Sequence, residues 1–399
     1  MPGPISSSTL APGSAATSVR RGAPAVAARI LEVATYPPPR SGWAVRIEFL
    51  KKRLEQEGHQ CVVLNLGSSR LIPSPEYETI QGGRDLLRKL WRFSSRGFVV
   101  HAHTNGDSIK GAILALTAQL VNLAWGRRAF LTFHAGAIQQ FFPRYRAWYL
   151  TPLYWLIFTI PKKVICNSEA VKQCIRGYGI PAGKIAAIPA FSSQYMEFTP
   201  TPLPADLEAF LERYPAAVFT YARMRPLFYP ITMIDGMAEV MARNPDVGLV
   251  LCGGLSHRED WLWRDVQARI EATGLSERIC MVEDLDHDAF LTALTRSSLY
   301  LRTPITDGVA SSVLEALALR VPVVACENGT RPAGVITYPA EDAAALAAKV
   351  EHVLNHRAAV VAGMQQLNVV DTLADEVAVL TDAAVRPVNV KGAPEPEWP

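Results

Sequence analysis

Short apolar runs alternate with longer amphipathic runs along most of this chain. The apolar runs include ILEVAT at 30–35, FVVHAH at 98–103 and VPVVA at 321–325. Apolar runs of this length are typical of strands buried on both faces, and the helices between them would cover a parallel sheet. The alternation therefore predicts an α/β fold built from doubly wound, Rossmann-like sheets.

One interruption divides the pattern into two domains. At 399 residues the chain is too long for one ordinary core. Residues 192–215 are rich in proline and poorly periodic, which predicts a linker. A first Rossmann-like domain is thus expected at 28–191 and a second at 216–370.

The composition of the two ends predicts that they are disordered. Residues 1–27 are rich in Ser, Ala, Pro and Gly and contain no acid, which predicts a disordered extension, although organelle transit peptides share this composition. A disordered tail is expected at 386–399.

The six cysteines form no C-x-x-C pair and mostly lie in or beside apolar runs. They indicate buried, reduced thiols of a cytoplasmic protein, with no disulfide and no metal site.

The charge is unevenly distributed. The formal net charge is +3, but residues 1–200 hold 24 Lys and Arg against 10 Asp and Glu, and residues 201–399 hold 16 against 27. A basic first half suggests an anionic partner. No nucleic-acid-binding motif is recognised, so an anionic membrane surface or a phosphate-bearing acceptor fits better.

One apolar run bears on the membrane question. WYLTPLYWLIFTI at 148–160 has thirteen residues, fewer than the ~20 that a membrane-spanning helix needs. Basic residues at 144, 146, 162 and 163 flank it. Two interpretations stay open, a helix buried against the first sheet and a helix that rests in the membrane interface.

The stretch 302–326, RTPITDGVASSVLEALALRVPVVAC, carries the most specific signal. A strand leads into an Asp-Gly loop, a helix from about Ser311 to Leu319 and a Val-rich strand. The N-terminus of a helix placed beyond a strand's carboxyl end offers free N–H groups and a positive dipole end to a phosphate. Ser312 and Glu315 also match a capping box, which is the local alternative for Glu315.

Asp307 and Glu315, eight residues apart, resemble the acid-x7-acid signature of retaining GT-B glycosyltransferases, the family-4-like group. The resemblance runs from about Arg29 to Asp382. It implies two Rossmann-like domains facing a cleft, and a last helix at 371–385 that crosses back to the first domain. It also implies a hexosyltransferase that moves a sugar with retention from a nucleotide-diphosphate sugar to a lipid-linked or polysaccharide acceptor. Cell-envelope or exopolysaccharide synthesis would be its setting, at the cytoplasmic membrane face, without cofactor or metal.

The resemblance also assigns roles to residues. Glu315 would hold the ribose hydroxyls, Asp307 the transferred sugar, and Arg223 the leaving diphosphate, assisted by backbone N–H groups at the start of the helix. His134 follows a buried strand at the place of a family histidine that lines the donor sugar, and its pKa is expected near neutrality. The remaining donor-binding candidates are Gly42, Gly254, Gly308, Ser311, Ser312 and Val313.

One departure from the family pattern keeps a second function open. The family usually has a lysine five residues after the Arg223 position, where this chain has Phe228. Arg225 could supply the missing charge, because alternate residues of an extended segment face the same side. Without that charge, the chain could instead be a non-catalytic GT-B homologue that binds a nucleotide or sugar as a partner subunit. A phosphorylase or a sugar-nucleotide epimerase of the same fold is a closer rival.

Two groups of residues suggest metal ligands but have simpler explanations. His101 and His103 lie on one face of a predicted strand, but no further residue with ligand spacing accompanies them. Asp284 and Asp286 open a predicted helix, where acids are favourable without a metal. We expect both groups to be structural.

Overall fold

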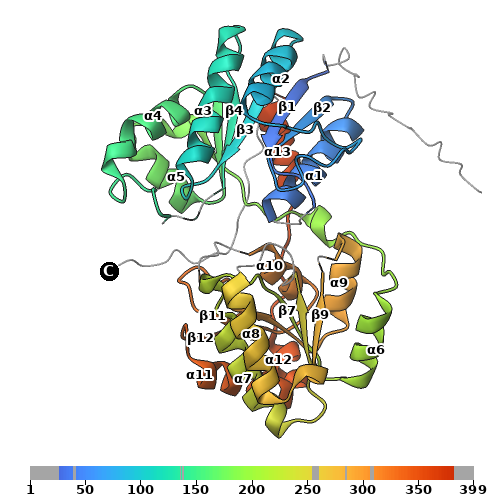
Figure 1. The fold of residues 1–399 in the computed structure, drawn as a ribbon. Coiled ribbons are helices and arrows are strands. Elements are labelled where there is room, and N and C mark those ends of the chain that lie inside the picture. The colour runs from blue at the N-terminus through green and yellow to red at the C-terminus, as the bar shows by residue number, and fades with distance from the viewer. Residues whose placement is uncertain are drawn as a thin grey trace, which may run out of the picture.

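The structure, a computed structural model, describes residues 27–38, 42–134, 136, 139–253, 260–283, 285–305 and 310–381. Figure 1 shows two domains, each a sheet with helices on both faces. Both sheets have six strands, and every strand pair is parallel. The predicted fold class, two doubly wound Rossmann-like domains, is confirmed.

The first domain contains the sheet with strand order β2-β1-β3-β4-β5-β6. Its strands are β1 (Arg29–Ala34), β2 (Gln60–Asn65), β3 (Val99–Thr104), β4 (Phe130–Phe133), β5 (Lys163–Cys166) and β6 (Ile185–Ala187). Its helices are α1 (Gly42–Gln56), α2 (Gly83–Ser95), α3 (Ile109–Ala124), α4 (Thr151–Thr159) and α5 (Glu169–Arg176), with short 3-10 turns η1 (Trp148–Leu150), η2 (Ala182–Lys184) and η3 (Ser193–Met196). Each apolar run that predicted a strand in the first domain forms a strand in the structure.

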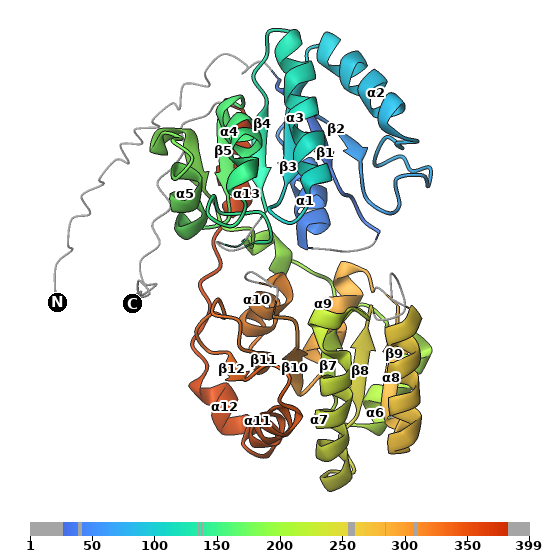
Figure 2. The same ribbon diagram turned by 60° about the vertical axis from the view of Figure 1, so that its left-hand side comes forward.

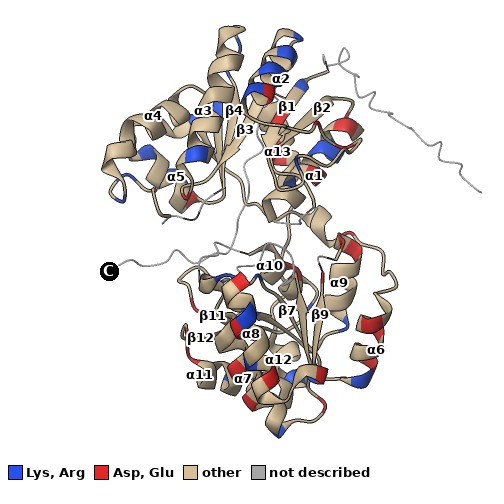
Figure 3. Cartoon of the chain, in the orientation of Figure 1, with Lys and Arg blue, Asp and Glu red and all other residues tan. Residues whose placement is uncertain are grey.

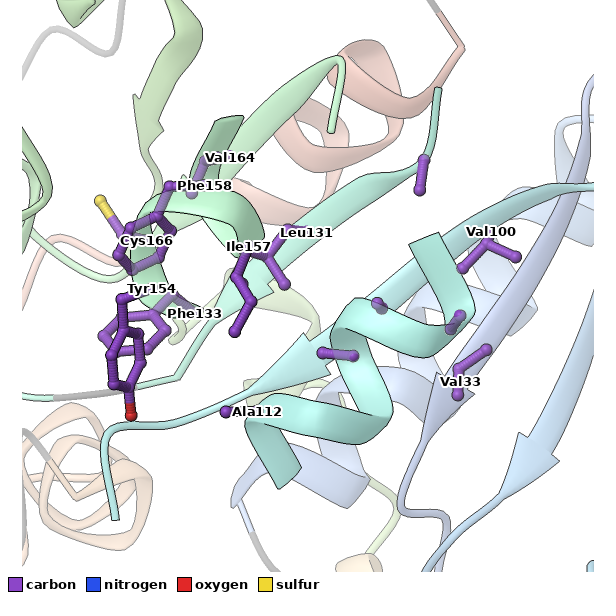
Figure 4. Packing of buried hydrophobic residues seen from close by; sticks show 14 of the residues in the cluster. Val33, Val100, Ala112, Leu131, Phe133, Tyr154, Ile157, Phe158, Val164 and Cys166 are labelled. Atoms are coloured by element: carbon purple, nitrogen blue, oxygen red, sulfur yellow. The ribbon is translucent and has the colours of Figure 1, made fainter. Parts of the chain in front are cut away.

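One core of this domain lies between the sheet and helices α3 and α4, and another lies between the sheet and helices α1 and α13. Figure 4 shows Ile157 and Phe158 of α4 close to Leu131 and Phe133 of β4, and all four side chains are fully buried. The helix expected in the apolar run 148–160 is shorter in the structure, where residues 148–150 form a 3-10 turn and α4 begins at Thr151. Proline at the start of α4 has no N–H to donate, so it fits a first helical turn and not a helix interior.

The second domain contains the sheet with strand order β12-β11-β10-β7-β8-β9. Its strands are β7 (Val218–Tyr221), β8 (Leu249–Cys252), β9 (Ile279–Val282), β10 (Leu299–Arg302), β11 (Val323–Cys326) and β12 (Ile336–Tyr338). Its helices are α6 (Ala205–Arg213), α7 (Pro230–Arg243), α8 (Asp260–Thr273), α9 (His287–Thr295), α10 (Ser311–Ala318), α11 (Ala343–Asn355) and α12 (Arg357–Gly363), with turns η4 (Pro226–Phe228) and η5 (Ser276–Arg278). The edge strands β6 and β12 escaped prediction because each has only three residues.

The linker predicted at residues 192–215 is wrong for residues 205–213, which form a helix. Helix α6 occupies 205–213, and its residues Leu207, Phe210 and Leu211 are buried in the core of the second domain. Three of the four prolines in this segment precede the helix, and Pro204 stands at its N-cap position. The connection between the domains is therefore shorter than the sequence suggested.

Helix α13 (Thr372–Leu380) returns to the first domain and packs against α1, as Figures 1 and 2 show for the red helix at the end of the described chain. Its Glu376 forms a buried ion pair with Arg46 of α1 at 2.6 Å, with 1% and 3% of the two side chains exposed. Arg46 also donates to the carbonyl of Ala190 and to the hydroxyl of Thr372. This charged contact anchors α13 on the first domain.

In the part of the chain that the structure describes, every helix is too short or too polar to cross a membrane.

Candidate active site

The two sheets turn the carboxyl ends of their strands toward a shared cavity of about 410 Å³. The order in which strands are added across the sheet reverses between β1 and β3 in the first sheet and between β7 and β10 in the second. Ligands of open α/β sheets bind beside such reversals, outside the carboxyl ends of the strands. The cavity is therefore the candidate site.

Residues from both domains line this cavity. Eight of them were singled out from the sequence: Gly42, His134, Arg223, Arg225, Phe228, Ser311, Ser312 and Glu315. The other lining residues are Trp43, Val45, Arg46, Asn167, Ala190, Tyr221, Cys252, Leu285, His287, Phe290, Arg302 and Ala310. The structure thus brings most of the predicted set together.

Four predicted residues lie outside the described residues. These are Asp307 and Gly308 in the loop before α10, Gly254 after β8, and Asp284. Asp286, which is described, accepts a hydrogen bond from the N–H of Ala289 and caps α9.

The N-termini of two helices from different domains meet at the cavity. Gly42 begins α1 and Ser311 begins α10, and a Cβ atom at position 42 would lie only 3.2 Å from the Ser311 Oγ. Glycine therefore permits this close approach between the domains. Both helices direct the positive ends of their dipoles into the cleft, where an anion would be stabilised.

The start of α10 differs from the capping box that the sequence allowed. Its N-cap residue is Ala310, and the hydroxyl of Ser312 accepts a hydrogen bond from Tyr300 Oη at 2.7 Å. Glu315 therefore does not close a capping box with Ser312. Glu315 lines the cavity, with 7% of the residue exposed.

Val313 does not fit its predicted role. Its side chain is buried in the core, and its N–H donates to the carbonyl of Ala310 at 3.1 Å, within the first turn. The N–H groups of Ser311 and Ser312 donate to no partner in the described part of the chain. Only these two N–H groups remain available to a phosphate at this helix end.

Three arginines of the second domain line the cavity together with Phe228. Two of them, Arg223 and Arg225, belong to one segment. The segment is not extended as expected, because the N–H of Arg225 donates to the carbonyl of Arg223 at 2.8 Å and closes a tight turn. Arg302, at the end of β10, donates to the carbonyl of Tyr221 at 2.6 Å and lies 5.7 Å from the centre of the Phe228 ring. The sequence reading missed Arg302, although it is the one charged residue in the apolar run that forms β10.

His134 lies between an aromatic ring and a buried histidine. The indole ring of Trp43 stacks on it with a centroid distance of 4.5 Å, and its Nε2 lies 2.9 Å from Nδ1 of His103. Burial and the neighbouring His103 lower the pKa of His134 well below its usual value. The expected pKa near neutrality is therefore wrong, because burial and the neighbouring His103 both disfavour the charged ring.

Behind His134, Glu32 joins His101 and His103 into a fully buried cluster. Its two carboxylate oxygens lie 3.0 Å from His101 Nδ1 and 2.7 Å from His103 Nε2. The ligating atoms lie within 4.8 Å of one another, a spacing that could hold a metal ion. A metal ion would have to displace both hydrogen bonds, so the cluster as it stands is a hydrogen-bonded ion pair. Glu32 was missed because its neighbours in the run ILEVAT are mostly apolar.

Both halves of the chain match family models. Residues 40–191 match the model described as Glycosyltransferase Family 4, and residues 213–362 match the model described as Glycosyl transferases group 1. No curated protein matches the chain in sequence.

Solved structures with the same fold cover nearly the whole chain. The crystal structure of HepE from Anabaena in complex with UDP-glucose has a TM-score of 0.64 and 16% identity, over 89% of this chain and 97% of that chain. The trehalose-6-phosphate synthase OtsA has a TM-score of 0.61 and 13% identity, over 90% and 100%. A UDP-N-acetylglucosamine 2-epimerase has a TM-score of 0.60 and 12% identity, over 88% and 95%. At these identities the likeness concerns the fold alone.

Proposed function

We propose that this chain, which belongs to the GT-B glycosyltransferases, transfers a hexosyl group from a nucleotide-diphosphate sugar with retention. The premise is that glycosyltransferase family models match both of its halves. The single observation that carries this proposal is the cavity between the domains. There two helix N-termini, Arg223 and Arg225 converge with Glu315. Such a site offers positive groups to a diphosphate and an acceptor to a ribose.

Each of these groups has a task in the proposed reaction. The N–H groups of Ser311 and Ser312, with Arg223 and Arg225, stabilise the negative charge that develops on the leaving diphosphate. Fixed donors of this kind need no reorganisation during the reaction and usually supply the largest share of catalysis. Glu315 accepts hydrogen bonds from the ribose hydroxyls. We propose that the reaction requires no metal, because the cations and helix ends already meet the diphosphate.

Turnover of a panel of nucleotide sugars tests the proposed function. The purified chain is incubated with UDP-, GDP- and ADP-hexoses, with and without EDTA, and release of the nucleoside diphosphate is measured. UDP-glucose is the first donor to test, because it occupies the similar HepE structure. We expect turnover of at least one donor, unchanged by EDTA. Binding without any turnover would favour the alternative of a non-catalytic partner subunit, and formation of an epimeric nucleotide sugar would favour an epimerase.

Glu315→Gln should weaken binding of the cognate nucleotide by about tenfold or more. Hydrogen bonds to a charged carboxylate contribute about 1.5–3 kcal/mol, and the neutral amide replaces one acceptor oxygen by a donor. Calorimetric titration with the nucleoside diphosphate measures the effect. Glu271→Gln, on the exposed side of α8, serves as the control and should bind like wild type. An unchanged affinity in Glu315→Gln contradicts the assignment.

Exposed apolar side chains on the outer face of the first domain bear on the acceptor. Several large apolar side chains are exposed on η1 and α4, including Trp148 at 76% and Trp155 at 46%. Helix α3 beside them has a single charged residue, Lys110, and exposes Ile113 and Leu120. Figure 3 shows how few charges α3 carries. One face of α4 is thus buried in the core, whereas the other fits a membrane interface.

We propose that this face rests on the anionic cytoplasmic membrane and that the acceptor is lipid-linked, in cell-envelope or exopolysaccharide synthesis. The exposed aromatic side chains would enter the interfacial layer. The exposed basic residues Arg144, Arg146 and Lys162 flank them and would meet lipid phosphates.

Flotation with anionic liposomes should recover the chain at low salt and much less at high salt. Each basic residue near an anionic surface contributes about 1 kcal/mol, and salt screens this attraction. The variant Trp148→Ser/Trp155→Ser should lose most of the binding, whereas Trp261→Ser, an exposed tryptophan of the second domain, should keep it. Wild-type protein that stays unbound at low salt contradicts the membrane proposal.

A further inference from the structure

A continuous chain of hydrogen bonds runs from His134 into the interior of the first domain. His134 Nε2 lies 2.9 Å from His103 Nδ1, and His103 Nε2 lies 2.7 Å from one oxygen of Glu32. The other oxygen of Glu32 lies 3.0 Å from His101 Nδ1, and His101 Nε2 lies 2.7 Å from the Thr132 hydroxyl. All members behind His134 are buried, so water cannot supply alternative partners. Each hydrogen bond in this series must then have a donor on one side and an acceptor on the other.

The far end of the chain fixes the first protons. Glu376 is paired with Arg46, so it is a carboxylate that accepts, and the Thr132 hydroxyl donates to it at 3.4 Å. The Thr132 oxygen then accepts from His101 Nε2, while His101 Nδ1 donates to Glu32. His101 thus donates from both nitrogens and is an imidazolium. Although burial alone would lower the pKa of His101, the charge of Glu32 raises it, in agreement with this assignment.

The protons of His103 and His134, at the cavity end of the series, are assigned in the same way. The second oxygen of Glu32 accepts from His103 Nε2, so the proton of His103 is on Nε2. Burial, with the positive His101 beside it, holds the pKa of His103 well below its usual value, so this ring is neutral. Its Nδ1 must then accept, and His134 donates to it from Nε2. His134 is neutral as well, so its Nδ1 carries a lone pair and has no hydrogen-bond partner among the described residues.

We propose that Glu32 and His103 are positioning residues that hold His134 in its Nε2–H tautomer, so that Nδ1 accepts a hydrogen bond from a hydroxyl group of the transferred sugar. The sugar part of this proposal rests on the function proposed above. The stacked Trp43 ring fixes the plane of the imidazole, and the buried chain fixes its proton. Glu32 thus acts on the donor through two histidines without touching it.

The charges of the buried chain are balanced. His101 and Arg46 are positive, and Glu32 and Glu376 are negative. Because the four charges cancel in pairs, the interior holds them without a net buried charge, which would be far more costly. Neutral His103 and His134 extend the chain from this balanced cluster to the cavity.

The tautomer of His134 is measured directly by two-bond 1H–15N correlation spectra of full-length protein labelled with 15N-histidine. The His134 signal is assigned by its loss in His134→Asn. We expect a protonated Nε2 and an unprotonated Nδ1 in wild type without any ligand. His103→Leu removes the acceptor and should give a mixture of tautomers, as should Glu32→Gln. A wild-type His134 protonated on Nδ1, or on both nitrogens, overturns the proposal.

Steady-state kinetics test the consequence for the donor. In His103→Leu the KM for the nucleotide sugar should rise about tenfold, the effect expected when a buried acceptor is lost. His103→Asn should restore most of it, because the asparagine Oδ1 can take the place of Nδ1 and accept from His134. A purely structural role of His103 would instead lower the activity of both variants in parallel, and that result contradicts the proposal.

Asn122→Ala is the matched control. Asn122 is a buried polar residue of the same domain, bonded to the N–H of Val100 and the carbonyl of Phe98, and it does not line the cavity. Its replacement should reduce stability without changing the His134 tautomer or the KM. A wild-type chain that turns over no nucleotide sugar would refute the proposed function, but the spectra would still decide whether Glu32 and His103 hold the tautomer.

Discussion

Arg223→Ala and Arg225→Ala should each lower turnover of the nucleotide sugar by about a hundredfold. Removing one fixed donor to a developing negative charge typically costs about 10²–10³ in kcat. Both side chains line the cavity together with the start of α10. Phe228→Ala should change turnover only a few-fold, because a phenyl ring offers no charge to a diphosphate. Initial rates at saturating donor measure all three variants.

Arg213→Ala is the control for this series. Arg213 lies on α6 with 64% of its side chain exposed and pairs with Glu277, away from the cavity, so its loss should leave turnover unchanged. If Arg225→Ala is as active as wild type, Arg225 does not replace the lysine that the family usually has at position 228. Arg302, beside the Phe228 ring, would then be the next cation to replace.

Glu376→Ala should destabilise the protein by about 3–5 kcal/mol. Removing one member of a buried ion pair leaves the other charge without compensation in a medium of low polarity. Arg46 cannot reach water, because only 3% of its side chain is exposed. Its Nη1 donates to the Ala190 carbonyl and the Thr372 hydroxyl, and its Nη2 donates to the Thr372 carbonyl. The first thermal unfolding transition should fall by on the order of 10 °C. Differential scanning calorimetry measures it.

Two further variants separate the charge from the contact. Glu351→Ala removes an exposed ion pair with Arg243 and should cost about 1 kcal/mol or less. Arg46→Met/Glu376→Leu replaces the buried pair by apolar side chains and should recover much of the stability. A Glu376→Ala protein as stable as Glu351→Ala would show that Arg46 is not buried as described.

The sequence predicts the fold well because burial on both faces gives a strand a continuous apolar run. The runs at 30–35, 98–103 and 321–325 form β1, β3 and β11, with bounds that differ by one or two residues. The three-residue strands β6 and β12 leave too short a pattern to recognise. Helix α6 was hidden because proline content suggested a linker, whereas three apolar side chains of this segment anchor it on the second domain.

The site was predicted in part, and its misses share a cause. Residues after strand ends, such as His134 and Arg223, were found because they match family residues at the carboxyl ends of strands, the edge of a parallel sheet that faces the cleft. Glu32, Arg46 and Glu376 were missed, because a charged residue in a strand or helix is usually solvated and only tertiary contacts show its burial. Glu32 and Glu376 are 344 positions apart in the chain, and both contact the side-chain hydrogen-bond network around His101. No local pattern contains such a contact.

The position of α13 has a consequence for biosynthesis. The first sheet is complete once residue 187 has left the ribosome, but Arg46 receives its counter-ion only when Glu376 emerges. At a synthesis rate of 5–20 residues per second, this interval lasts roughly 10–40 s. During that time Arg46 lacks both its counter-ion and its hydrogen bonds to Thr372 of α13, and the second domain is made within the same interval. Because Arg46 also lines the cavity, the donor site reaches its final form only when nearly the whole chain has been translated.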